Sequence, residues 1–260
     1  MHTLTLGKHN TKLIELRKAI DRGTLTPDGL LPVESPKLFE DALRSGLEVS
    51  GVFVRAGSPI PDVPARTVVY ELEPAVFKTI QSTETSQGVI ALVRLRHFDL
   101  EELTGASRGA LLVILSRLQD PGNVGTVLRI AESFFATGCV ATKGTASIYN
   151  SKVVRASAGS VFRMPYVWNV EPEDTFRRIH DAGIAIVGTS PAASRSIDTW
   201  DWRRPTALTI GNEGNGLSEE EIHMCDAILK IPQNPAVESL NSAMAAAVVL
   251  YEASKQRKKR

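Results

Sequence analysis

The second half of the chain alternates short apolar runs with longer amphipathic segments. The apolar runs are rich in leucine, isoleucine and valine and predict buried strands at residues 110–115, 184–187, 207–210 and 227–231. Between them, apolar residues recur at helical spacing and predict helices around Val127–Phe134 and at residues 174–182, 218–224 and 241–256. This alternation is typical of an α/β fold with a mostly parallel sheet and helices on both faces.

The first hundred residues follow a shorter pattern. Helical periodicity runs over residues 8–20, and a second helix is predicted at 35–46, where Ser35 is placed to cap it. Strands rich in valine and isoleucine are predicted at 49–55 and 88–95. This half therefore predicts a small N-terminal α/β domain.

A polar, acidic segment separates the two halves and is typical of a linker. We therefore expect a first domain at residues 1–96, a linker at 97–108 and a second domain at 109–260. The chain ends in a basic tail, residues 255–260.

Composition and charge narrow the class of protein. The 260 residues carry 30 lysine and arginine side chains against 29 aspartate and glutamate side chains, a formal net charge of +1. No global positive field results, so an anionic partner must bind local patches. Cys139 and Cys225 lie outside any metal-binding spacing, and we expect no metal site. We see no secretory segment or membrane-spanning run and expect a cytoplasmic protein.

The turn after the apolar run 110–115 carries the first candidate chemistry. It reads Gln-Asp-Pro-Gly-Asn and ends at Asn123, and Arg129 follows it, off the apolar side of the predicted helix. Ligands of α/β sheets bind at the carboxyl ends of the strands, where a fixed arginine can meet an anionic substrate. The alternative is a solvated surface arginine, and this segment alone leaves the two readings even.

Three further strand ends carry glycine or polar residues: Gly188-Thr189, Gly211 to Gly216, and Ile231-Pro232 leading to Ser239-Leu240-Asn241. Glycine lets a ligand approach the backbone, although plain turn chemistry is the simpler reading for Gly188. The order Gly211-x-x-Gly214-x-Gly216 differs from that of the dinucleotide fingerprint, and no Walker loop is present. We therefore reject both of these nucleotide sites.

In their order along the chain, these motifs resemble those of the SpoU-type RNA 2′-O-ribose methyltransferases of the SPOUT superfamily. The resemblance rests on Asn123-x-Gly125-x-x-x-Arg129, Ile210-Gly211-Asn212-Glu213-Gly214-x-Gly216, and Ile231-Pro232 followed by Ser239-Leu240-Asn241. It extends from residue 107 onward and includes the segment 149–159. The first hundred residues resemble the RNA-binding extension of the rRNA-modifying members, which often have Glu-Gly where this chain has Glu34-Ser35.

The resemblance implies a knotted fold and a cofactor. The C-terminal segment of such enzymes threads through a loop to form a trefoil knot, a rare exception to unknotted topology. S-adenosyl-L-methionine binds in that knot, which implies that Gly211, Ile231 and Leu240 line the cofactor pocket and that Gly188 and Thr189 lie near it.

The resemblance also implies a homodimer whose active sites draw on both subunits. The helix from Asn241 carries Met244, Val248 and Tyr251 on one side and is a candidate dimer surface. Packing of this helix against its own sheet is the other reading, and the two are compatible.

By the same resemblance, the catalytic candidates are Arg129, Asn123, Glu213, Ser239 and Asn241. We expect Arg129 to hold a phosphate beside the target ribose and to orient the 2′-hydroxyl, because a guanidinium resists the deprotonation that a base requires. Glu213 is expected to pair with an arginine such as Arg129 and orient it.

Capping is the alternative role for several polar candidates. Asn123 either contacts the ribose or caps the helix that follows it, and Ser239 and Asn241 either contact substrate or cap the last helix. Ser218 and Glu221 fit a capping box and are assigned no function.

Contacts with RNA phosphates are expected from local basic residues. The candidates are Arg94 and Arg96 in the first half, Lys143, Lys152, Arg155 and Arg163 in the middle of the chain, and the basic tail. Most of them individually have the alternative of an ordinary solvated charge.

Other functions fit parts of this pattern. A non-catalytic RNA-binding protein on the same scaffold is expected to lack Arg129 or the Glu213 loop, and both are present. Methylation of an RNA base is a nearer rival, but the Asn123 and Arg129 motif favours ribose. The N-terminal domain favours ribosomal RNA over transfer RNA as the substrate.

Overall fold

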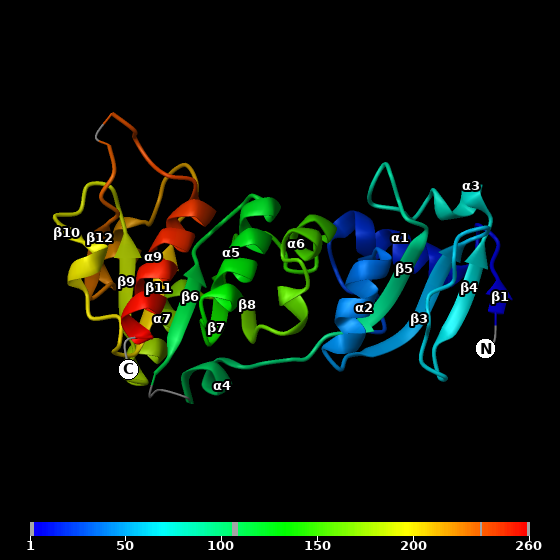
Figure 1. Cartoon of the computed structure of the whole chain (residues 1–260), viewed down its shortest axis with the longest axis horizontal. Coiled ribbons are helices and arrows are strands. Elements are labelled where there is room, and N and C mark those ends of the chain that lie inside the picture. The colour runs from blue at the N-terminus through cyan, green and yellow to red at the C-terminus, as the bar shows by residue number, and fades with distance from the viewer. Residues whose placement is uncertain (1–2, 106–108, 235, 259–260) are drawn as a thin grey trace. The chain divides into compact units, whose positions relative to one another are not determined.

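The computed structural model describes residues 3–105, 109–234 and 236–258. It divides into two compact units, one made of Met1–Arg96 with Ser147–Arg163 and one made of His97–Ala146 with Met164–Arg260 (Figure 1). The division after Arg96 coincides with the predicted start of the linker. Residues 147–163, which the sequence places in the second domain, instead pack within the first unit, where Ser147 Oγ donates to the Gly23 carbonyl at 2.7 Å.

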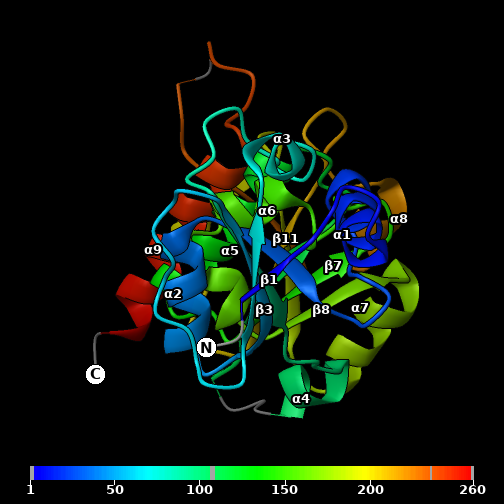
Figure 2. The same ribbon diagram turned by 90° about the vertical axis from the view of Figure 1, so that its right-hand side faces the viewer.

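The first unit is built on a mixed five-stranded sheet in the order β1-β4-β3-β5-β2. Its elements are β1 (Thr3–Thr5), α1 (Thr11–Arg22), β2 (Leu31–Glu34), α2 (Pro36–Arg44), β3 (Glu48–Arg55), β4 (Val68–Leu72), α3 (Pro74–Phe77), β5 (Val89–Arg94), α6 (Ser151–Ala156) and a 3-10 turn at Ser160–Phe162. Helices α1 and α2 lie on opposite sides of β1 and β3 (Figure 2). Leu13 and Leu16 of α1 pack on Phe53 and Tyr70, whose rings stack with centroids 4.8 Å apart.

Ser35 lies where β2 turns into α2 and has an unusual backbone conformation. Its φ is 122° and its ψ is 146°, a backbone conformation that residues other than glycine rarely adopt. The Ser35 hydroxyl caps α2 by accepting the Leu38 N–H at 3.2 Å, as the sequence predicts. The enzymes that this chain resembles often carry glycine here, and glycine adopts this conformation without strain. Serine is strained in it but caps α2.

Replacing Ser35 by glycine is expected to raise the free energy of unfolding by about 1 kcal/mol, because backbone strain of about 1–3 kcal/mol is relieved and a glycine N-cap loses only a few tenths. Urea denaturation followed by circular dichroism measures the change. Ser35→Ala is the matched control, since it keeps the strain, loses the cap and should destabilise the protein. A Ser35→Gly protein less stable than the parent would contradict the assignment of strain.

The second unit contains a seven-stranded sheet in the order β10-β12-β9-β11-β6-β7-β8, with every neighbouring pair parallel. Its elements are α4 (Leu100–Gly105), β6 (Leu111–Leu115), α5 (Pro121–Ser133), β7 (Gly138–Thr142), β8 (Tyr166–Val170), α7 (Pro172–Asp181), β9 (Ala185–Thr189), β10 (Arg195–Ser196), a 3-10 turn at Ile197–Thr199, β11 (Thr206–Ile210), α8 (Glu219–His223), β12 (Ala227–Lys230) and α9 (Ser242–Arg257).

Both faces of this sheet are covered, which confirms the predicted α/β class. Leu112 and Ile114 of β6 share a core with Phe176 and Ile179 of α7. Alternate strand residues point to opposite faces, so Val113 points to the other side. Helices α5 and α9 lie side by side (Figure 1). The trefoil knot stays a prediction.

Two features of the second unit differ from the sequence-based reading. The predicted linker contains α4. Its Leu100 and Leu103 lie one turn apart and so on the same side of the helix, and both are buried in the core of the second unit. Strands β7 and β8 were not predicted, since β7 has only three apolar residues between Gly138 and Thr142 and Asn169 interrupts β8. No helix in the described ranges has the length and apolar character that crossing a membrane requires.

Candidate functional site

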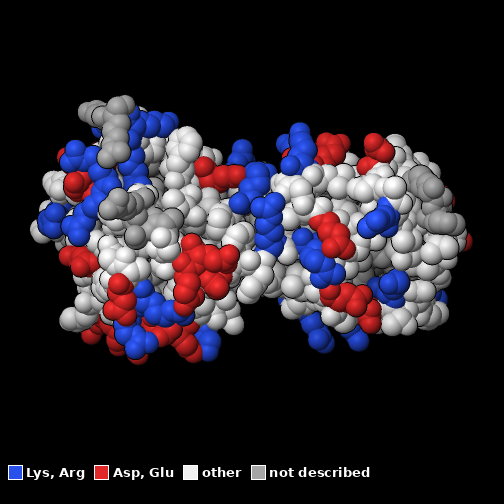
Figure 3. Space-filling view, turned by 90° about the horizontal axis from the view of Figure 1, so that it is seen from below, with Lys and Arg blue, Asp and Glu red and all other residues white. Residues whose placement is uncertain are grey.

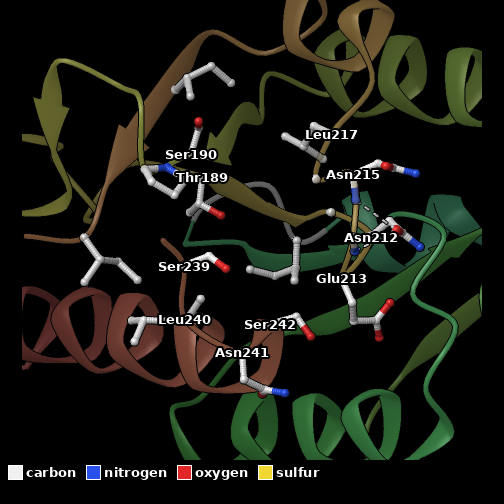
Figure 4. A pocket seen from close by; sticks show the side chains of 18 of the residues that line it. Thr189, Ser190, Asn212, Glu213, Asn215, Leu217, Ser239, Leu240, Asn241 and Ser242 are labelled. Atoms are coloured by element: carbon white, nitrogen blue, oxygen red, sulfur yellow. Dashed lines mark hydrogen bonds between the residues drawn. The ribbon is translucent and has the colours of Figure 1, made fainter. Parts of the chain in front are cut away.

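A pocket of about 480 Å³ opens at the carboxyl edge of the large parallel sheet. Thr189 ends β9, Gly211 follows β11 and Ile231 follows β12, so parallel strands bring these three residues to one edge. The segment before α9 completes the wall with Ser239, Leu240 and Asn241 (Figure 4). The predicted cofactor residues are therefore brought together, with the exception of Gly188.

Gly188 does not line this pocket. A Cβ at this position would lie 2.6 Å from Leu217 Cδ1 and 2.7 Å from Ile228 Cδ1, so the glycine allows close packing behind the pocket wall. Thr189, its neighbour on β9, does line the pocket.

Gly211 is required by the path of the loop that follows β11. A Cβ there would lie 2.4 Å from the Gly216 carbonyl carbon and 2.6 Å from the Leu217 nitrogen, both of which are backbone atoms. Every residue from Gly211 to Leu217 lines the pocket, and we call this segment the 211–217 loop. The loop can fold back this tightly only because position 211 lacks a side chain.

Asn212 organises the 211–217 loop. Its N–H and carbonyl pair with the carbonyl and N–H of Gly216 at 3.0 and 2.9 Å. Its side-chain oxygen accepts the N–H groups of Gly214 and Asn215 at 3.0 and 3.2 Å. Asn212 was not predicted as a functional residue; the signal for its role is an asparagine between glycines, which is typical of an Asx turn.

Glu213, Asn123 and Asn241 form a chain of hydrogen bonds beside the pocket. Asn123 Nδ2 donates to Glu213 Oε1 at 3.2 Å, and Asn241 Nδ2 donates to Asn123 Oδ1 at 3.0 Å. The two bonds span 90 and 118 positions in sequence and join the 211–217 loop to the first turns of α5 and α9. The three motifs of the sequence therefore meet in one network.

Glu213 faces the start of α5 rather than Arg129. Its carboxylate accepts the N–H groups of Gln119 at 3.2 Å and Asp120 at 3.1 Å, besides the Asn123 amide. Partial burial raises the pKa of the Glu213 carboxyl, but these hydrogen bonds outweigh it and the net pKa is lowered. Within one chain the Glu213 carboxylate is thus bonded to two backbone N–H groups and the Asn123 amide rather than to Arg129. The expected pairing of Glu213 with an arginine stays a prediction.

The helix caps are assigned by the structure. Asp120, not Asn123, caps α5 by accepting the Asn123 N–H at 2.8 Å. Asn241, not Ser239, caps α9 by accepting the N–H groups of Ala243 and Met244. The side chain of Asn123 is thereby released from capping and joins the network, while Ser239 lines the pocket. The capping box of Ser218 and Glu221 is confirmed.

Arg129 lies on the exposed side of α5 and is not among the residues that line the pocket. Its neighbours Val127 and Leu128 are buried, which fixes the rotation of the helix and directs Arg129 outward. Within one chain, the pocket and the proposed catalytic arginine are thus separate features.

Most of the predicted phosphate contacts fall in the first unit, whereas Lys143, which pairs with Glu171, and the basic tail belong to the second. Arg94 and Arg96 are exposed and each donates to a backbone carbonyl, Asp28 and Ser45 respectively. Arg155 is half-buried and donates to Ser82 Oγ at 2.8 Å, so part of its guanidinium is already used inside the unit. Lys152 is exposed on α6.

Polar residues that the sequence analysis did not select also line the pocket. They are Ser190, Asn215, Gln233 and Ser242. The described parts of the chain contain no group of three or more His, Cys, Asp or Glu side chains arranged to hold a metal ion.

Comparison with known proteins agrees with this geometry. A model described as the SpoU rRNA Methylase family matches residues 110–251. The chain is 35% identical over 235 residues to an uncharacterized tRNA/rRNA methyltransferase of Synechocystis sp., a match that covers 88% of this chain and 85% of that protein. It is 29% identical over 243 residues to the 23S rRNA (guanosine(2553)-2'-O)-methyltransferase RlmP of Bacillus subtilis, covering 93% of this chain and 95% of that protein.

A solved structure is similar over nearly the whole chain. The SpoU methyltransferase AviRb from Streptomyces viridochromogenes, in complex with the cofactor AdoMet, matches with a TM-score of 0.87 and 28% identity over 96% of this chain and 99% of that one. The family model, the sequence relatives and the solved structure thus all indicate the same family. The three motifs that meet beside the pocket agree with them. The chain belongs to the SpoU rRNA methylase family.

Proposed function

We propose that this protein transfers a methyl group from S-adenosylmethionine to a ribose 2′-hydroxyl of ribosomal RNA. The observation that carries the proposal is the pocket at the carboxyl edge of the parallel sheet, with the Glu213–Asn123–Asn241 network beside it. Family membership and the AdoMet complex of a relative with the same fold support it.

The pocket suits the methyl donor in size and chemistry. Its volume of about 480 Å³ lies within the range of about 300–1,000 Å³ that small-molecule sites occupy. Leu217, Ile231 and Leu240 offer apolar walls for an adenine ring, and the backbone of the 211–217 loop offers N–H and carbonyl groups to its edge. When bound, the cofactor supplies a sulfonium methyl group, which is already electrophilic.

The remaining task of the protein is to align the attacking oxygen, a poor nucleophile until its proton is shared or removed. We assign Arg129 to hold a phosphate next to the target ribose, because its planar fork matches phosphate oxygens and its proton is held too tightly for base catalysis. Asn123 and Asn241 keep the first turns of α5 and α9 in register with Glu213. A phosphate oxygen or water then takes the hydroxyl proton.

We further propose that the protein acts as a homodimer and that Arg129 serves the partner subunit's pocket. Large apolar side chains are exposed where α5 ends and along α9: Phe135 is 66% exposed, Met244 57%, Val248 39% and Tyr251 58%. Patches of this kind mark interaction surfaces. Arg129 is exposed on α5, which packs beside α9. A partner subunit bound to this surface would therefore contact the Arg129 side chain.

The first unit is proposed to bind the RNA through Arg94 and Arg96, with Lys152 as a further contact. On the face seen in Figure 3, basic and acidic side chains are interleaved rather than gathered into one field. Binding therefore depends on individual exposed arginines, as expected from the formal net charge of +1.

Mapping of methylated nucleotides tests the reaction. Ribosomal RNA from cells with and without the protein should differ by an alkali-resistant linkage, because a 2′-O-methyl group removes the hydroxyl that attacks the phosphodiester. A methyl mark that leaves the linkage alkali-sensitive would indicate base methylation. Absence of any mark, in rRNA and tRNA, would favour a non-catalytic RNA-binding protein.

A further inference from the structure

Arg117 and Glu221 lie outside the three motifs, yet a partly buried ion pair joins them beside the 211–217 loop. Arg117 Nη1 and Nη2 bind Glu221 Oε1 and Oε2 at 3.0 and 2.7 Å, in the two-pronged geometry that a guanidinium and a carboxylate favour. The Glu221 side chain is 2% exposed and that of Arg117 is 35% exposed.

The Glu221 carboxylate is fully used. Besides the two arginine N–H groups, it accepts the Ser218 N–H at 2.9 Å and a short hydrogen bond from the Ser116 hydroxyl. Burying a carboxylate is unfavourable unless hydrogen bonds replace its water, and here four donors do so. A capping box alone accounts for only one of these bonds, so helix capping does not explain the burial of Glu221.

Arg117 also binds the 211–217 loop through its backbone. Its carbonyl accepts Asn212 Nδ2 at 2.9 Å, and Asn212 is the residue that folds the loop. Arg117 presents this carbonyl from a left-handed conformation with φ of 52°, which is uncommon for a residue with a side chain. The ion pair on its side chain anchors the residue in that conformation.

Both ends of the loop are therefore tied to one pair of residues. Asn212 at its start is held by the Arg117 carbonyl, and Ser218 just after its end is held by the Glu221 carboxylate. The ion pair between Arg117 and Glu221 links these two contacts to each other. Because every residue of the loop lines the pocket, the distance between its two ends sets the width of that wall.

We propose that Arg117 and Glu221 are positioning residues that hold the 211–217 loop in its cofactor-binding shape. The inference rests on the proposed function, since it takes S-adenosylmethionine as the ligand of the pocket. Neither residue lines the pocket, so each acts through the loop.

Calorimetric titration of the full-length protein with S-adenosylmethionine tests the proposal. Arg117→Met and Glu221→Gln should each raise the Kd about tenfold, because the loop would hold its binding shape only about a tenth of the time. Arg117→Lys keeps the charge but loses the fork, and its Kd should lie between those of Arg117→Met and the parent protein.

Arg257→Met is the matched control for destabilisation. Arg257 is a partly buried arginine of the same unit, donating to the carbonyls of Trp202, Ala110 and Arg204 at the end of α9. This variant should lower the melting temperature and leave the Kd within about twofold, because no residue that it contacts lines the pocket.

The outcomes separate the two proposals. Parental binding of S-adenosylmethionine with a raised Kd in the Arg117 and Glu221 variants, but not in Arg257→Met, supports the positioning role. Lower melting temperatures with an unchanged Kd in folded Arg117→Met and Glu221→Gln would overturn it. Failure of the parent protein itself to bind S-adenosylmethionine would overturn the proposed function instead.

Discussion

Replacing Arg129 by alanine is expected to lower the rate of methyl transfer by about 10²- to 10³-fold, the loss typical when one oriented charge is removed from a transition state. The affinity for S-adenosylmethionine should stay unchanged, because Arg129 does not line the pocket of its own chain. Transfer of labelled methyl groups to ribosomal RNA measures the rate, and calorimetry measures the affinity.

Two controls sharpen this prediction. Arg177→Ala removes another exposed helix arginine of the same unit, with a side chain 70% exposed, and should leave the rate unchanged. Arg129→Lys keeps the charge but cannot bind phosphate in the two-pronged manner, so its rate should fall between those of alanine and arginine. A fully active Arg129→Ala protein would remove Arg129 from the mechanism.

A mixed dimer decides which subunit Arg129 serves. One subunit carries Arg129→Ala with an intact pocket, and the other carries Gly211→Ala with an intact Arg129. If Arg129 acts across the dimer, one of the two sites is complete and about half of the parental activity is expected. If Arg129 acts within its own chain, the mixed dimer is inactive, and a monomeric parent protein would refute the arrangement altogether.

Replacing Gly211 by alanine is expected to weaken binding of S-adenosylmethionine by about a hundredfold or more. The added methyl group would lie 2.4, 2.6 and 2.7 Å from backbone atoms of Gly216 and Leu217, and backbone cannot yield as a flexible side chain can. Opening the turn would break the Asn212 to Gly216 pairing and displace the wall of the pocket. Calorimetric titration measures the effect.

Gly214→Ala is the matched control within the same loop. A Cβ at Gly214 has no neighbour nearer than Asn212 Oδ1 at 3.6 Å, an ordinary contact, and its φ is not positive. Cofactor affinity should therefore change by less than about threefold. Equal losses in both variants would show that the backbone contact at position 211 is not the cause, and would refute the steric role of that position.

Much of the fold was predictable because its signals are local. The apolar runs that became β6, β9, β11 and β12 are short and nearly uninterrupted, as buried parallel strands are. Strand β7 escaped prediction because its apolar run is only three residues long, and β8 because Asn169 interrupts its run. Their pairing with neighbouring strands identifies both. Helix α4 was predicted to be part of a linker because Glu101 and Glu102 make the segment polar, although Leu100 and Leu103 on either side of them are buried.

The site was predictable as a set of residues but not as a set of contacts. Motif order identified Asn123, Glu213 and Asn241, whereas their mutual hydrogen bonds appeared only in the structure. Local reasoning also offered Asn123 as the cap of α5, where Asp120 is the cap, since both residue types are equally good at this position.

The sequence by itself determined the strand ends, the glycine-rich turn and the three motifs, because these depend on neighbours within a few residues. Only the tertiary structure decided that Glu213 faces the start of α5, that Arg117 and Glu221 meet across 104 positions, and that residues 147–163 pack in the first unit. Such contacts depend on the order of the parallel strands, which brings distant segments to one edge of the sheet. The spacing of residues along the chain does not reveal that order.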